Sequence, residues 1–231
     1  MSKAKMNSEG ALVPGSSAWN AGWRMQVKVK ICGITNLADA RAAAEAGADV
    51  LGFVFYDKSP RSISCEAAAA IIRELPPFVI KAGVFVNAPG DAVLRAVREC
   101  GLNLLQFHGE EPPDYCLQFG IMSMKAFRVR NAASLQSLRD YPTDAWLLDA
   151  YTPDKLGGTG EAFNWELARE AQSWGRPIFL AGGLTPENVA DAIRSARPYA
   201  VDVSSGVEAA PGQKDPARIK AFIQAAKQTD I

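Results

Sequence analysis

Three side chains that could transfer protons stand at the ends of short apolar runs in this 231-residue chain. They are Cys32, Asp149 and His108, the single histidine. A strand-end cysteine is usually a small buried hydrophobe, and an aspartate there often caps a loop, so structural roles stay open for both. Burial at the mouth of an apolar site would favour the protonated carboxyl of Asp149. That carboxyl could then act as an acid near neutral pH.

Glycine and serine pairs after two later apolar runs suit an anionic ligand. They are Gly182-Gly183 and Ser204-Ser205-Gly206. Glycine lets a backbone approach closely, so that N–H groups can contact a phosphate, and a short helix opened by Ser205 would add a favourable dipole. The alternative is that these glycines only make tight turns.

These residues must be positioned by a regular alternation of strands and helices. Eight short apolar segments, typical of strands buried on both faces, are Val27–Ile31, Val50–Phe55, Ile80–Val86, Leu104–Phe107, Ser123–Phe127, Ala145–Leu148, Ile178–Ala181 and Ala200–Val203. The gaps hold segments with helical periodicity at Leu37–Ala46, Cys65–Leu75, Ala92–Cys100, Pro113–Phe119, Ala132–Arg139, Trp165–Ser173, Pro186–Ala196 and Pro216–Lys227. Gly47, Ser64 and first-turn prolines supply helix boundaries.

Eight βα units fit either an open doubly wound sheet or a single closed (β/α)8 TIM barrel. A nucleotide-binding doubly wound sheet usually carries a glycine fingerprint after its first strand, whereas this chain has Cys32-Gly33-Ile34-Thr35 there. The barrel is therefore the predicted fold. Barrel chemistry lies at the C-terminal strand ends, where Cys32, Arg61, Gln106, His108, Asp149 and the glycine and serine turns collect.

Composition excludes several other functions. The 25 basic and 25 acidic residues cancel, which argues against a nucleic-acid or anionic-membrane partner. One histidine and four cysteines without CxxC spacing exclude a multi-histidine zinc site.

No apolar run approaches the roughly 18 residues of a membrane span, and no signal peptide is visible, so we expect a cytoplasmic protein with reduced thiols. Residues 1–26 are expected to be a tail and 27–231 the barrel, with an ordered extra helix as the alternative.

Seven motifs in order together resemble the phosphoribosylanthranilate isomerase family. They are KICGIT (30–35), GFVF with SPR (52–55 and 59–61), GVFVN (83–87), QFHG (106–109), LLDAYTPDKLGGTGEAFNW (147–165), LAGGLTPENV (180–189), and VDVSSGVE with KD (201–208 and 214–215). Each motif is weak alone, but seven in register are specific. The resemblance covers nearly everything after Val27 and agrees with the barrel.

The resemblance implies an Amadori rearrangement in tryptophan biosynthesis. By motif, Cys32 would be the general base and Asp149 the general acid. Arg61 would face the anthranilate carboxylate, although a solvated loop arginine is the simpler interpretation of that residue alone. Gly182, Gly183, Ser204, Ser205 and Gly206 would hold the phosphate. Gln106 and His108 would orient or contact substrate. No metal or cofactor is implied, and the partner is a small sugar phosphate bound to a monomer or homodimer.

Three alternatives stay open. A ribulose-phosphate epimerase is expected to show paired aspartates and metal-binding histidines, against which the single histidine counts. An indole-glycerol-phosphate synthase needs a lysine acid and strand-end glutamates. Lys125 could be that lysine, but the glutamates are missing. A silent barrel that only binds a sugar phosphate would show affinity without turnover.

Overall fold

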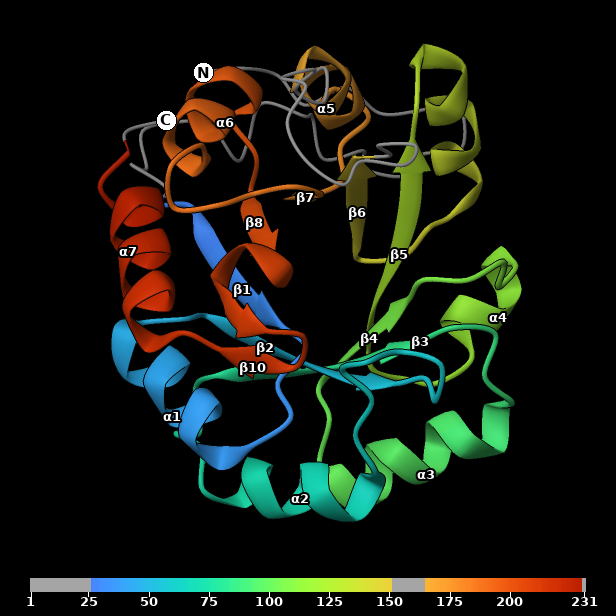
Figure 1. Ribbon diagram of the computed structural model, residues 1–231. Helices are drawn as coiled ribbons and strands as arrows, with labels where there is room; N and C mark the ends of the chain where they lie inside the picture. Colours follow the sequence, from blue (N-terminus) through green and yellow to red (C-terminus); the bar gives the residue numbers. More distant parts are fainter. Residues whose placement is uncertain (1–25, 151–164, 230–231) are drawn as a thin grey trace, which may run out of the picture.

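The computed structural model describes residues 26–150 and 165–229, in which eight parallel strands close into a barrel surrounded by helices (Figure 1). Each strand pairs with the next, and the eighth pairs with the first. The strands are β1 (Lys28–Cys32), β2 (Val50–Phe55), β3 (Ile80–Phe85), β4 (Leu104–Phe107), β5 (Met122–Val129), β6 (Ala145–Ala150), β7 (Ile178–Ala181) and β8 (Ala200–Val203). The predicted (β/α)8 barrel is therefore confirmed.

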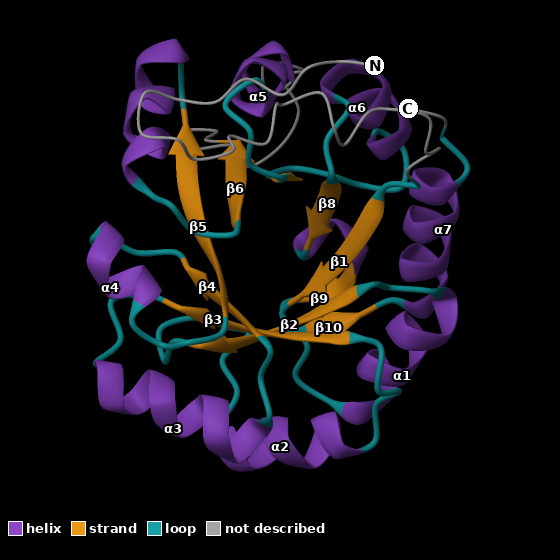
Figure 2. Ribbon diagram, turned by 180° about the vertical axis from the view of Figure 1, so that it is seen from behind, coloured by secondary structure: helices purple, strands orange, loops and turns teal. Residues whose placement is uncertain are grey.

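Helices fill the gaps between strands and form the outer ring (Figure 2). They are α1 (Leu37–Ala46), α2 (Cys65–Arg73), α3 (Gly90–Cys100), α4 (Pro113–Leu117), α5 (Trp165–Gln172), α6 (Val189–Ala196) and α7 (Pro216–Lys227). Local signals explain several boundaries. Asn36 and Ser64 cap α1 and α2, and Gly47 ends α1 with a φ of 97° that a residue with a side chain rarely adopts.

Two helix predictions were wrong in detail. The segment Ala132–Asp140 is a 3-10 helix, η1, opened by a capping box in which the Asn131 and Ser134 side chains bond each other's backbone N–H groups. The expected helix from Pro186 begins only at Val189. A turn precedes it, closed by the Thr185 N–H group donating to Asn188 Oδ1 over 2.8 Å. Side-chain-to-backbone bonds of this kind compete with the helix for its first turn.

The barrel places its functional side chains by strand alternation. Successive residues point to opposite faces, so Lys30 and Cys32 of β1 share the inward face, while Val29 and Ile31 join the outer core under the helices. In register, Lys30 lies beside Asp202 of β8, and Cys32 lies beside Gly52 of β2. Below this level the barrel interior is filled by an apolar cluster that includes Leu104, Met124, Leu147 and Phe179.

A short antiparallel hairpin after β8 was not predicted. It follows a single 3-10 turn, η2 (Ser205–Val207), and pairs β9 (Glu208–Ala210) with β10 (Gln213–Lys214). Thr35, in the loop after β1, donates its hydroxyl to the Gly212 carbonyl over 2.6 Å. The hairpin is thereby tied to the mouth of the barrel.

Some expectations fall outside the described residues. The expected tail, apart from Gln26, and most of the LLDAYTPDKLGGTGEAFNW motif, at 151–164, belong to this group. None of the described helices is long and apolar enough to cross a membrane. Within 26–150 and 165–229, no group of three histidine, cysteine or acidic residues is arranged to hold a metal ion. All four cysteines are free thiols.

Candidate active site

A cavity of about 360 Å³ opens at the C-terminal ends of the barrel strands. It is lined by all ten residues that sequence analysis singled out: Cys32, Arg61, Gln106, His108, Asp149, Gly182, Gly183, Ser204, Ser205 and Gly206. Asp202 lines it as well, and Val54, Tyr56 and Val84 give it an apolar wall. The cavity therefore combines ionisable groups, backbone turns and an apolar surface, as ligand sites usually do.

Cys32 lies in the inner wall of this cavity, beside a buried charge pair. Its side chain packs against Val54 and Val84, and the residue is 8% exposed. Lys30 Nζ lies 2.7 Å from Asp202 Oδ1, and the lysine side chain is completely buried. Burial raises the pKa of the Cys32 thiol, the Lys30 ammonium opposes that rise, and Asp202 adds to it. Burial alone would lower the pKa of Lys30, but Asp202 and Cys32 outweigh it, so Lys30 stays protonated.

Asp149 lies at the opposite wall, at the end of a chain of polar side chains. Its Oδ2 atom is 3.4 Å from His108 Nε2, and His108 Nδ1 is 3.0 Å from Gln106 Nε2. If the Gln106 amide donates to Nδ1, the imidazole proton sits on Nε2 and points at Asp149; this tautomer follows from the contacts. The Asp149 side chain is 34% exposed, so its burial is only partial.

Gln106 has a buried side-chain oxygen that no group of the described residues satisfies. Its Oε1 is buried and has no hydrogen-bond partner, the only such side-chain atom among the described residues. Orphaned buried polar atoms are rare, and a functional site is one of the places where they occur.

The loops after β7 and β8 bring backbone close to the cavity. Gly182 and Gly183 have φ values of 88° and 66°, which favour glycine, and they line the cavity together. A Cβ atom added to Gly206 would collide with the Leu184 carbonyl oxygen, so only glycine lets the two loops approach this closely. The short helix expected from Ser205 is a single 3-10 turn, so backbone N–H groups, not a helix dipole, are what this corner offers an anion.

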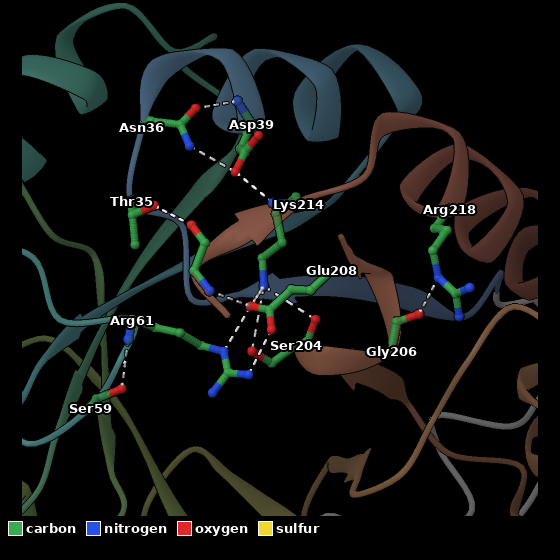
Figure 3. Close-up of polar contacts among 11 residues, drawn as sticks. Thr35, Asn36, Asp39, Ser59, Arg61, Ser204, Gly206, Glu208, Lys214 and Arg218 are labelled. Atoms are coloured by element: carbon green, nitrogen blue, oxygen red, sulfur yellow. Dashed lines mark hydrogen bonds and ion pairs between the residues drawn. The ribbon is translucent and has the colours of Figure 1, made fainter. Parts of the chain in front are cut away.

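Glu208 joins the loop after β8 to Arg61 (Figure 3). Arg61 donates from Nε and Nη2 to the two Glu208 oxygens, over 2.7 and 2.6 Å. Lys214, whose side chain is completely buried, lies 2.8 Å from Glu208 Oε1 and donates to the Ser204 carbonyl over 3.2 Å. Burial raises the pKa of Glu208, but the bonds from Arg61 and Lys214 outweigh it, and the net direction is down. Arg61 thus presents only its other edge, Nη1 and Nη2, to the cavity.

Sequence analysis missed the charged residues behind the site. Lys30, Asp202, Glu208 and Lys214 all stood inside quoted motifs, yet none was assigned a role. Lys30 and Asp202 could have been identified from the sequence, because they are charged residues within strands that are expected to be apolar on both faces. Lys125, considered as a synthase acid, does not line the cavity. It forms a buried pair with Glu111 over 2.9 Å.

Comparison with known proteins agrees with this geometry. The family model described as N-(5'phosphoribosyl)anthranilate (PRA) isomerase matches residues 29–225. A protein of that name from Trichlorobacter lovleyi is 58% identical over 202 residues, covering 87% of this chain and 98% of the relative. One from Citrifermentans bemidjiense is 60% identical over 201 residues, covering 87% and 97%.

Solved structures give the same result. The crystal structure of phosphoribosyl anthranilate isomerase from Thermotoga maritima superposes with a TM-score of 0.81 at 48% identity, covering 87% of this chain and 98% of the other. A structure of phosphoribosyl anthranilate isomerase in complex with reduced 1-(o-carboxyphenylamino)-1-deoxyribulose 5-phosphate has a TM-score of 0.78 at 46% identity, with the same coverage. This chain therefore belongs to the phosphoribosylanthranilate isomerase family.

Proposed function

We propose that this chain converts N-(5'-phosphoribosyl)anthranilate into 1-(2-carboxyphenylamino)-1-deoxyribulose 5-phosphate in tryptophan biosynthesis, with Cys32 as general base and Asp149 as general acid. The observation that carries the proposal is the convergence of a buried thiol, a carboxyl group and two glycine- and serine-containing turns in one cavity. Family membership supplies the substrate, and the cavity supplies groups of the right chemistry at its walls.

The reaction needs one proton delivered and another removed. Asp149 protonates the ribose ring oxygen, the C1–O bond breaks, and the nitrogen lone pair forms a C1=N iminium ion. The Cys32 thiolate then takes the proton from C2. The C2–H electron pair forms a C1=C2 double bond and the C1=N π pair moves onto nitrogen, which gives an enolamine. Loss of the hydroxyl proton at O2 and protonation at C1 produce the ketone. The substrate nitrogen accepts the electrons, so these steps need neither a metal nor a redox cofactor.

His108 and Gln106 support the acid in this scheme. When Asp149 releases its proton, the carboxylate faces the His108 Nε2–H group, which can stabilise the new charge. Gln106 holds the imidazole from its other side through Nδ1. This pair thereby orients Asp149, in keeping with the orienting role expected for His108.

The two ends of the substrate match two different parts of the cavity. The phosphate would lie against the backbone N–H groups of Gly182, Gly183, Ser205 and Gly206, beside Ser204. The anthranilate carboxylate would meet the free edge of Arg61, because Glu208 occupies the Nε edge. Glu208 therefore fixes the orientation of the guanidinium before substrate binds.

The setting of the reaction follows from the same reasoning. The partner is the small sugar phosphate, and the free thiols agree with a cytoplasmic enzyme. We expect residues 1–26 to act as a tail outside the barrel. A monomer and a homodimer are both compatible with the barrel; the Thermotoga maritima relative has been described as dimeric.

Turnover by purified protein tests the assignment. Cys32→Ala and Asp149→Asn should each lower kcat by well over ~100-fold, because each removes a group that moves a proton in the transition state. Binding of the reduced product analogue, measured by calorimetry, is the control and should persist in both variants. A wild-type protein that binds the analogue without turnover would support the silent barrel. Near-normal turnover of Cys32→Ala would shift the base role to His108.

A further inference from the structure

Lys30 is completely buried in the barrel interior, two residues before Cys32 on the same face of β1. We propose that Lys30, held in place by Asp202, is a positioning residue whose ammonium stabilises the thiolate form of Cys32. This inference deepens the proposed function and rests on it only for the use that the reaction makes of the thiolate.

Gly52, which has no side chain, leaves a space that the Lys30 ammonium and the Cys32 sulfur both border. A Cβ atom at Gly52 would lie 2.9 Å from Cys32 Sγ and 3.3 Å from Lys30 Nζ. Both polar atoms therefore border the same space, which only glycine leaves open. Glycine inside a strand weakens the strand, so its presence here calls for a reason of space. The reason is that the lysine extends toward the level of Cys32.

Stability alone does not explain the lysine. Replacing a buried ion pair by apolar residues of similar volume is often neutral or stabilising, because desolvation offsets the attraction between the charges. The next layer of the barrel interior is already apolar, so an apolar residue at this position would continue it. A cation beside a buried thiol can instead stabilise the thiolate, because charges interact strongly where water is excluded.

The other charges facing Cys32 leave the cluster one positive charge in excess. Asp202 of β8 faces it together with Lys30, Lys214 faces it from β10, and Arg61 faces it from the loop after β2. Arg61 and Lys214 share the single carboxylate of Glu208. Among these groups three cations stand against two carboxylates, so ionisation of Cys32 would balance the remaining charge.

The pKa directions agree with this arrangement. Burial raises the pKa of Cys32, whereas Lys30 and Lys214 lower it and Asp202 raises it. Removing the lysine charge should therefore move the thiol titration to higher pH, and removing the aspartate charge should move it to lower pH. Two substitutions at one ion pair should act in opposite directions.

Alkylation of Cys32 by iodoacetamide over a range of pH tests the proposal on the full-length protein. The thiolate is the reacting form, and peptide mass spectrometry separates Cys32 from the other three cysteines. In Lys30→Gln, the midpoint of the alkylation profile should rise by about one pH unit, so the rate at neutral pH falls about tenfold. In Asp202→Asn, the midpoint should fall below that of the wild type.

Lys125→Gln is the matched control, because it removes the charge of another buried lysine away from the cavity. Its alkylation midpoint should equal that of the wild type. An unchanged midpoint in Lys30→Gln, or an equal shift in Lys125→Gln, would overturn the proposal. Should Lys30→Gln fail to fold, a midpoint in Asp202→Asn that is unchanged or raised would overturn it equally.

The readout does not depend on turnover, so the two proposals fail separately. A shifted alkylation profile combined with normal kcat/KM in Lys30→Gln would leave the charge coupling intact and refute Cys32 as the base. An unshifted profile combined with inactive Cys32→Ala would leave the base assignment intact and refute the role of Lys30.

Discussion

Two buried lysine–carboxylate pairs, Lys30–Asp202 and Lys125–Glu111, lie on opposite sides of the closed barrel. Lys30 and Asp202 belong to the adjacent strands β1 and β8, whereas Lys125 belongs to β5 and Glu111 to the loop after β4. Their lysine-to-carboxylate distances are 2.7 and 2.9 Å, and both lysine side chains are nearly or completely buried. The two pairs thus share chemistry and burial but differ in surroundings.

The pair on the β5 side is surrounded by backbone groups. Glu111 accepts hydrogen bonds from the N–H groups of Asn87 and Gly109, over 2.7 and 2.9 Å, and Lys125 donates to the Gly109 carbonyl over 2.5 Å. This pair therefore ties the loops after β3 and β4 to β5. Lys30, by contrast, lies next to the Cys32 thiol in the wall of the cavity and borders the space left by Gly52. The role of a buried ion pair is therefore inferred from the groups that surround it, because the two pairs themselves are alike.

The largest expected effect concerns the stability that the Lys125–Glu111 pair contributes. Glu111→Ala should lower the free energy of unfolding by about 3–5 kcal/mol, because Lys125 is left buried and unpaired and two backbone N–H groups lose their acceptor. Denaturant unfolding measures this change. Arg95→Ala, which breaks an exposed i,i+4 pair with Glu99, is the control and should cost at most about 0.5 kcal/mol. Equal losses in the two variants would break the comparison.

A smaller effect concerns the pH dependence of turnover on the Lys30 side. Cys32 must be ionised to act as the base, and burial raises the pKa of its thiol above the ordinary value. The pH profile of kcat/KM should therefore show an alkaline inflection at the pKa of Cys32.

The same profile tests the coupling between Lys30 and Cys32. In Lys30→Gln the alkaline inflection should move to higher pH, because the thiol loses a charge that lowers its pKa. An inflection at the wild-type pH would contradict the coupling.

Much of the barrel could be predicted because its signals are local. Apolar runs such as Val50–Phe55 and Ile178–Ala181 coincide with the strands, and α1 and α7 have the predicted bounds. Active sites of such barrels lie at the C-terminal ends of the strands, and all ten residues expected there line one cavity. Periodicity could not predict the 3-10 form of η1, or the late start of α6, because side-chain hydrogen bonds to the backbone decide both.

The charged support of the site could not be predicted in the same way. Lys30 and Asp202 are 172 positions apart in the chain, and only closure of the barrel between β1 and β8 pairs them. The bond between Arg61 and Glu208 likewise depends on an unpredicted hairpin. Sequence analysis expected the planar fork of Arg61 to face a substrate carboxylate, whereas the carboxylate on its Nε edge in the structure belongs to Glu208.

The most direct test of Cys32 as the base is a kinetic isotope effect with substrate deuterated at ribose C2. In Cys32→Ser, the serine hydroxyl is a weaker base than the cysteine thiolate, so removal of the C2 proton should be slower. The isotope effect on kcat should then exceed that of the wild type, and turnover should fall. Deuterium at C2 reports that step alone. A Cys32→Ser protein with wild-type turnover and an unchanged isotope effect would contradict the account.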